Sequence, residues 1–142
     1  MSTIIEFALA EWGEAERAGT AVNPRIIEYL KTVGLGQLGD GEPWCGAFAA
    51  WCAVRASIVP PSFPAVARSW LSVGQPVTSP RVGDIVVFRR GASWEGHVAF
   101  YIRHSPDKRH VLTLGGNQGD KVGINEYEAE DVLGFRRIGE GR

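Results

Sequence analysis

Residues 43–56 read PWCGAFAAWCAVRA, and this stretch decides the fold. From residue 46 to residue 56 the side chains are apolar nearly all round a helical wheel, which is typical of a helix buried on every side. We therefore predict a central buried helix over residues 46–56. Cys45 comes directly before it, after Pro43 and Trp44.

Cys45 is the candidate nucleophile. Free N–H groups and a positive partial charge at a helix N-terminus favour a thiolate, and the same N–H groups can bind an oxyanion. The alternative is a small buried hydrophobic residue, which is what most free cysteines are. Cys52 lies among Ala and Val in mid-helix and is expected to be a core thiol. Along a helix the two Cα atoms would be roughly 10 Å apart, too far for a disulfide, so two free thiols are expected, as in a reducing compartment.

Two helices are expected ahead of this one. Residues 3–6 (TIIE) match a capping box, and an apolar periodic run follows them to about Ala18. Asn23 as N-cap and Pro24 at the first helical position begin a second helix, which Gly34 ends. Beyond the central helix, the pattern predicts a short helix over residues 65–72 and a loop over residues 76–80.

The second half of the chain is rich in short β-branched and aromatic runs separated by turn residues. Helices first and then strands joined by short turns indicate an α+β fold with an antiparallel sheet. The predicted strands cover residues 84–89, 97–103, 110–114, 122–127 and 132–138.

His97 is the candidate general base among three histidines. His104 and His110 flank the polar turn SPDKR and are expected to be exposed. His97 instead opens a strand after a glycine-containing loop, where side chains often face a cleft. Strand alternation puts His97 on one face with Ala99 and Tyr101, and residues 98, 100 and 102 on the other. The alternative for His97 is a hydrogen-bonded core histidine.

A general base needs a group that orients its second ring nitrogen. Antiparallel pairing of strands 97–103 and 110–114 would return the chain past His97 and bring Asn117 close to it. Asn117 is therefore the predicted orienting residue, although its glycine-rich surroundings also suit a plain turn residue. Gln118 is the second candidate, but alternation would point it the other way if the strand continued.

The composition limits the function classes. The formal net charge is -1 and no basic run stands out, which argues against nucleic-acid binding. No apolar stretch is long enough to span a bilayer, and the N-terminus lacks the basic region of a signal peptide. With two cysteines and three dispersed histidines, no zinc-site spacing is present. A chain of 142 residues is expected to form one domain over residues 1–142.

Four motifs together resemble the CHAP family, the cysteine, histidine-dependent amidohydrolases/peptidases related to NlpC-type cell-wall peptidases. The matching stretches are PWCGAF at 43–48, GDIVVF at 83–88, GHVAFY at 96–101 and LGGNQ at 114–118. The resemblance implies a papain-like α+β fold in which N-terminal helices precede the sheet and the nucleophile begins a central helix packed on the antiparallel sheet. It implies hydrolysis of amide bonds in bacterial peptidoglycan, with Cys45 as nucleophile, His97 as base and Asn117 as orienting residue. Many members carry an acidic residue just before the Asn position, where this chain has Gly115 and Gly116.

Three residues are candidate substrate contacts. Trp94 lies in the loop before His97 and could form a groove wall. Trp44 could form another, although core packing is the stronger expectation for it. Gln118, beside Asn117, is the third candidate. Asp84 is expected to begin a strand and to take no part in chemistry.

The predicted reaction is amide hydrolysis through a thioester acyl-enzyme, which requires no metal and no cofactor. Either an amidase or an endopeptidase fits. The alternatives are a papain-like acyl or amide transferase acting on a protein, and a catalytically idle wall-binding module. The expected partners are peptidoglycan stem peptides and an immunity or delivery protein. We expect the chain to be made in the cytoplasm without a signal peptide and to act at the cell wall or periplasm after delivery, as a phage lysin or an antibacterial effector.

Overall fold

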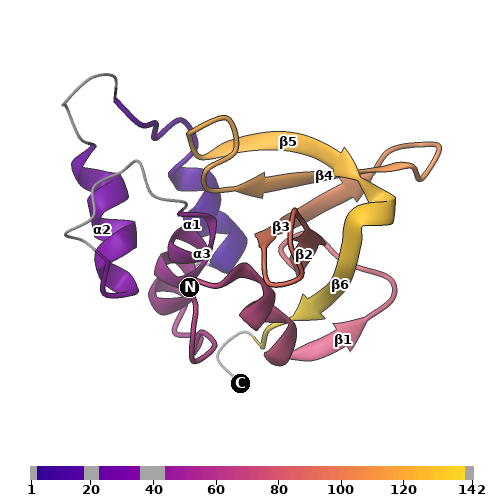
Figure 1. Cartoon of the computed structure of the whole chain (residues 1–142), viewed down its shortest axis with the longest axis horizontal. Helices are drawn as coiled ribbons and strands as arrows, with labels where there is room; N and C mark the ends of the chain where they lie inside the picture. The colour runs from indigo at the N-terminus through magenta and orange to yellow at the C-terminus, as the bar shows by residue number, and fades with distance from the viewer. Residues whose placement is uncertain (1–2, 18–22, 36–43, 140–142) are drawn as a thin grey trace.

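The computed structural model describes residues 3–17, 23–35 and 44–139. The helices gather on one side of the molecule and the strands on the other (Figure 1). In chain order the elements are α1 (Ile4–Ala10), α2 (Pro24–Thr32), α3 (Cys45–Arg55), η2 (Ala67–Ser72), β1 (Gln75–Val77), β2 (Ile85–Arg89), β3 (Gly96–His104), β4 (His110–Gly115), β5 (Gly123–Glu128), η3 (Ala129–Asp131) and β6 (Val132–Arg137).

The strands form one six-stranded sheet in the order β1-β6-β2-β3-β4-β5, and every neighbouring pair is antiparallel. The predicted α+β class with an antiparallel sheet is confirmed, and each of the five predicted strands is present. The sixth, β1 (Gln75–Val77), overlaps the start of the loop predicted over residues 76–80. Pro76 argues against a strand in the sequence, because proline cannot donate a hydrogen bond to a neighbouring strand and is tolerated only in an edge strand. β1 is such an edge, since it pairs with β6 alone.

The first two helices begin where the capping residues predict. The Thr3 side chain accepts from the Glu6 backbone N–H, and the Asn23 side chain accepts from the Arg25 backbone N–H at 2.8 Å. However, α1 ends at Ala10, well short of residue 18. The following segment instead forms an isolated β-bridge between Ala15 and Lys121, so tertiary pairing overrides the local periodicity.

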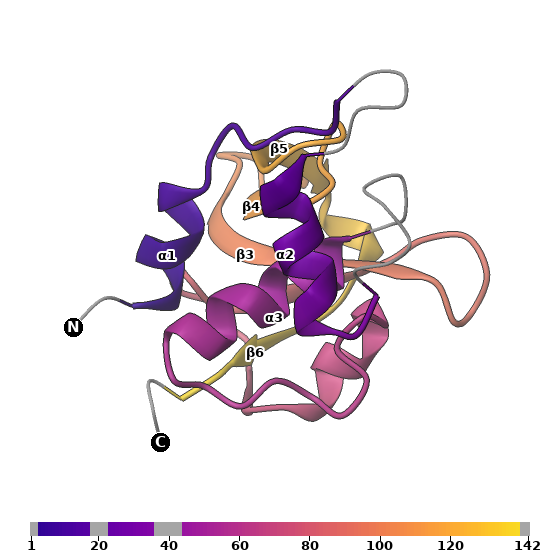
Figure 2. The ribbon, with the colours of Figure 1, turned by 90° about the vertical axis from the view of Figure 1, so that its left-hand side faces the viewer.

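Helix α3 is the centre of the core, as its sequence predicts. It lies between α2 and strand β3 (Figure 2). Tyr29 of α2 packs against Phe48 with ring centroids 5.0 Å apart, and Phe48 packs against Phe100 of β3 at 6.3 Å. Nine of the residues of α3 are buried, including Cys45 and Cys52, and both thiols are free.

The two faces of β3 belong to different clusters, which confirms the predicted alternation. Val98 and Phe100 face the helices in the main core. Ala99 and Tyr101 join a smaller cluster on the other face of the sheet. The predicted short helix after α3 is present as the 3₁₀ helix η2.

Candidate active site

Cys45 is the first residue of α3 and therefore lies at the positive end of an eleven-residue helix. The N-cap residue, Trp44, makes no side-chain capping bond to the first turn. The backbone N–H groups of Val98 and Gly46 instead donate toward the Cys45 sulfur. Val98 is free to do so because β4 pairs with β3 only from Phe100 onward, which leaves that edge of β3 open. The sequence thus brings the helix start against β3 beside His97.

The Cys45 side chain is buried, with 7% of its surface exposed. Burial raises the pKa of the Cys45 thiol above its usual 9.0, because a charged sulfur loses hydration there. The Val98 N–H and the positive charge of Arg90 oppose that rise. The resting group is therefore a thiol whose ionised form already has donors facing it.

His97 is almost completely buried on β3, with 1% of its surface exposed. Its ring lies between two aromatic side chains, 6.3 Å from Phe88 and 5.1 Å from Tyr127 between centroids. Burial lowers the pKa of His97 from 6.5 to about 4, and the positive charge of Arg90 adds to this effect, while the bond to Gln118 opposes it. The imidazole is consequently neutral at neutral pH and available as a base.

The orientation of His97 is set by Gln118. The Gln118 Nε2 amide donates to the carbonyl oxygens of Thr113 at 3.2 Å and Gly123 at 2.7 Å, and Thr113 Oγ1 donates to Gln118 Oε1 at 2.9 Å. Because the amide hydrogens face carbonyl oxygens, Oε1 is the atom turned toward His97, 2.8 Å from Nε2. An amide oxygen only accepts, so Nε2 of His97 carries the ring proton.

The other ring nitrogen, Nδ1, is left with an unshared electron pair. It is buried and has no hydrogen-bond partner among residues 3–17, 23–35 and 44–139. A buried acceptor without a partner costs free energy, and such atoms in folded proteins often have a catalytic role. Nδ1 of His97 is therefore a candidate proton acceptor. Nucleophilic cysteine catalysis needs a neutral imidazole with a free ring nitrogen, and the Val98 N–H that faces the Cys45 sulfur belongs to the residue directly after His97.

A family model of the CHAP domain matches residues 37–117, more than half of the chain, and that span includes both Cys45 and His97. The chain belongs to the CHAP family. The resemblance inferred from the four motifs is thereby confirmed, and with it a general function as an amidohydrolase or peptidase of peptidoglycan. None of the curated proteins compared with the chain matches it.

In this CHAP domain the side chain that contacts Nε2 of His97 is Gln118. The sequence had indicated Asn117 as the orienting residue. Asn117 adopts a left-handed backbone conformation with φ 57°, so the chain turns directly after β4 and strand alternation no longer applies. This turn aims Gln118 inward, and Gln118 is 1% exposed. Gln118 therefore cannot be the substrate contact that its position beside Asn117 suggested.

Trp44 is likewise not a substrate contact, because it is completely buried. Its indole N–H donates to Glu16 Oε2 at 2.9 Å, and its ring stacks on Tyr29 with centroids 5.7 Å apart. Gly116 passes so close that a Cβ there would lie 2.9 Å from the Trp44 ring, which explains the glycine before Asn117. Trp94 is 72% exposed in the loop before β3, so its role as a groove wall stays a prediction.

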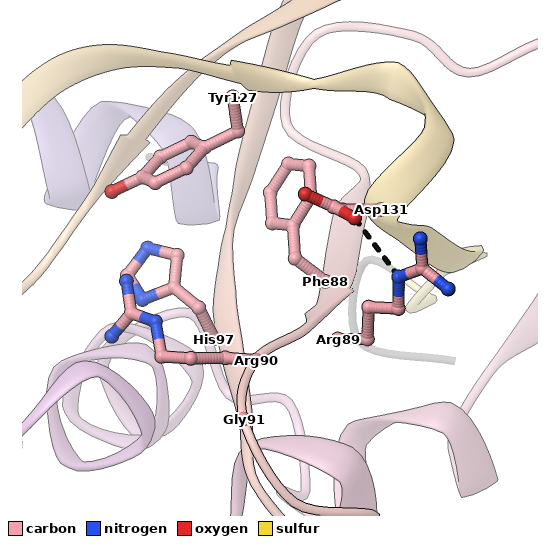
Figure 3. Close-up of a pocket in the computed structure, with 7 residues that line it drawn as sticks. All are labelled: Phe88, Arg89, Arg90, Gly91, His97, Tyr127 and Asp131. Carbon is pink, nitrogen blue, oxygen red and sulfur yellow. Dashed lines mark hydrogen bonds and ion pairs between the residues drawn. The ribbon is translucent and has the colours of Figure 1, made fainter.

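A pocket of about 520 Å³ opens beside His97 (Figure 3). Its lining contains two residues that the sequence analysis missed, Arg90 and Tyr127. Tyr127 could have been found from the pairing of β4 with β5, since it shares a sheet face with Val111, its register partner. No local signal marks Arg90, whose place depends on how the loop after β2 folds. The lining residues are Phe88, Arg89, Arg90, Gly91, His97, Tyr127 and Asp131.

Two classes of site have no counterpart in the described ranges. There, no three His, Cys, Asp or Glu side chains gather in a way that could hold a metal ion. Nor does any described helix combine the length and apolar character needed to cross a membrane.

Proposed function

We propose that this CHAP domain is a cysteine hydrolase that cleaves amide bonds in peptidoglycan, with Cys45 as nucleophile and His97 as general base. The observation that carries the proposal is the tautomer of His97. Gln118 holds the ring proton on Nε2, and the free Nδ1 is buried without a partner among the described residues, while the N–H of the next residue, Val98, faces the sulfur at the start of α3.

The reaction follows from these groups. Nδ1 of His97 takes the proton of the Cys45 thiol while the sulfur attacks the amide carbonyl carbon, and the carbonyl oxygen becomes an oxyanion. Backbone N–H groups at the start of α3 can stabilise this oxyanion. The imidazolium then gives its proton to the leaving amine, and the C–N bond breaks to leave a thioester on Cys45. Water, deprotonated by His97, hydrolyses the thioester and restores the thiol.

The test is release of new amines from purified peptidoglycan, with identification of the muropeptides by mass spectrometry. Cys45→Ala and His97→Ala should each abolish release, while Cys52→Ala, which changes a thiol buried in mid-helix, should retain it. Turnover by Cys45→Ala equal to that of the native chain would overturn the assignment. Products that carry a modified acceptor would indicate a transferase, and absence of any product together with wall binding would indicate an idle module.

Alkylation of the folded protein separates the same alternatives without a substrate. Iodoacetamide should modify Cys45 faster than Cys52, because Cys45 has donors facing its sulfur whereas Cys52 is fully buried. Equally slow modification of both thiols would support the idle module.

We further propose that the hydrolase acts at the cell wall, as a phage lysin or an antibacterial effector, because peptidoglycan is the substrate of the family. The expected outcome is that the chain, directed into the periplasm of a bacterium by an added signal peptide, lyses the cells. The Cys45→Ala variant, exported in the same way, should leave them intact. Lysis by both forms would show that toxicity does not depend on hydrolysis.

A further inference from the structure

Two neighbouring arginines, the last residue of β2 and the residue after it, line the pocket and point in different directions. Arg89 Nε pairs with Asp131 Oδ1 at 2.9 Å. Arg90 lies on the other side of the pocket, in the group formed by its guanidinium and the rings of His97 and Tyr127 (Figure 3). The pocket therefore holds one arginine with a carboxylate partner and one that is turned toward the catalytic histidine.

Arg90 is exposed, and its positive charge opposes the rise that burial causes in the pKa of Tyr127. It forms no ion pair with an Asp or Glu among residues 3–17, 23–35 and 44–139. Its charge acts on both Cys45 and His97, so it lies within electrostatic range of both reacting groups. A substrate group that enters the pocket beside His97 meets this cation, because both side chains line the pocket.

A guanidinium presents parallel N–H donors whose spacing matches a carboxylate, and pairs of this kind are stronger than neutral hydrogen bonds. Peptidoglycan stem peptides carry free carboxylates close to their amide bonds, at the α-carboxyl of γ-linked D-glutamate and at the peptide C-terminus. The chemistry of the substrate class therefore complements the charge that the pocket offers.

We propose that Arg90 is a specificity-determining residue, which binds a free carboxylate of the stem peptide in the pocket that it lines together with His97 and Tyr127. This inference rests on the proposed function for the identity of the substrate. It predicts a preference for stem peptides with that carboxylate over the same peptides with a carboxamide, and the preference should depend on Arg90 and not on Arg89.

Tuning of the Cys45 thiol by the charge of Arg90 is a separate effect. It would change turnover of all substrates by the same factor, because it acts before any substrate group is recognised. Carboxylate binding changes the ratio between the acid and the amide substrate. The ratio of kcat/KM values is therefore the quantity to measure.

The experiment compares three synthetic stem peptides: the free acid, one amidated at the D-glutamate α-carboxyl, and one amidated at the C-terminus. The native chain should prefer the free acid over one of the amides by at least about tenfold, the range expected for a charge-assisted hydrogen bond. The amidated peptide that the native chain cleaves with the lower kcat/KM identifies which carboxylate is bound. Arg90→Gln should bring the ratio close to one, and Arg90→Lys should restore it only in part, because lysine keeps the charge without the fork.

Arg89→Gln is the matched control and should keep the preference, because that side chain is already paired with Asp131. Tyr127→Phe should reduce the preference less than Arg90→Gln does. Equal turnover of acid and amides by the native chain would overturn the inference while leaving the hydrolase assignment intact. So would a preference that survives in Arg90→Gln.

A second measurement does not depend on peptidoglycan. Iodoacetate carries a carboxylate and iodoacetamide does not, so the ratio of their alkylation rates at Cys45 reports the positive charge that acts on this thiol. Arg90→Gln should lower the iodoacetate-to-iodoacetamide ratio roughly threefold, as for a partly exposed charge pair, and Arg89→Gln should not. If no peptide is cleaved but this ratio responds to Arg90, the proposed function fails and the carboxylate site stands. An unchanged ratio in Arg90→Gln would count against the site itself.

Discussion

His97 Nε2 lies 2.8 Å from Gln118 Oε1, and this contact assigns the proton on the imidazole. The carbonyl oxygens of Thr113 and Gly123 accept from the Gln118 amide and so fix which of its atoms faces His97. A side chain with both of its amide donors occupied cannot flip to offer an N–H to His97. The distant turn after β4 thus decides which nitrogen of His97 is free for chemistry.

We predict that Gln118→Ala lowers kcat by roughly a hundredfold, within the range for one general-base contribution, because the imidazole loses its fixed tautomer and orientation. Thermal unfolding checks that the variant is folded at the assay temperature. Asn117→Gly is the matched control, since glycine accepts the left-handed backbone at this position. It should keep kcat within about twofold of the native value, because Asn117 does not hold the ring. The reverse pattern would restore Asn117 as the orienting residue.

Acid should destabilise the fold through His97. Its pKa is about 4 in the folded chain against 6.5 as the usual value, so below pH 6.5 the unfolded chain binds the proton first. Stability is therefore fully present above pH 6.5 and declines as the pH falls toward 4, by about 3 kcal/mol in total at about 1.4 kcal/mol per pH unit.

Urea unfolding of the native chain and of His97→Gln, from pH 7.5 to 4, measures this contribution as the difference between the two slopes. His104→Gln should retain most of the acid sensitivity. Burial also lowers the pKa of His104, but this side chain is much less buried than His97. Parallel stability curves for the native chain and His97→Gln would contradict the neutral, buried state of the imidazole.

Much of this arrangement is predictable because it is local. A helix that is apolar all round must be buried, and this places Cys45 at the start of a core helix. The alternation of side chains along a strand places His97 and Val98 on opposite faces of β3. The end of α1 and strand β1 were missed, because long-range pairing with Lys121 and with β6 decides them. Gln118 was ranked second for a similar reason, since the turn at Asn117 breaks the alternation used to exclude it.

Asp84 is predicted to stabilise the fold and to take no part in the reaction. It is 5% exposed, and its carboxylate accepts from Arg137 Nε at 3.0 Å and Nη2 at 2.7 Å. Asp84→Asn should lower the free energy of unfolding by about 2 kcal/mol, because a partly buried charge pair is broken. The kcat of the folded protein should not change, since Asp84 does not line the pocket.

The control for Asp84 is Asp131→Asn, which breaks the Arg89 pair on the surface. Those two side chains are 59% and 37% exposed, so the loss in unfolding free energy should be below about 1 kcal/mol. Chemical denaturation of both variants gives the comparison. A larger loss for Asp131→Asn than for Asp84→Asn would mean that burial does not decide the strength of these pairs.

The position of Cys45 depends on the glycine after it. A Cβ at Gly46 would overlap the carbonyl oxygen of Pro64 and lie 3.0 Å from that of Ala65, and backbone atoms cannot rotate away. Gly46→Ala should therefore displace the start of α3, cost about 1–3 kcal/mol of stability and lower kcat/KM by about 10- to 100-fold. Gly134→Ala is the matched control, because its Cβ would meet only the movable end of Leu71, at 3.0 Å. If Gly46→Ala lost stability but kept native kcat/KM, the contact with residues 64 and 65 would support the fold without setting the place of the nucleophile.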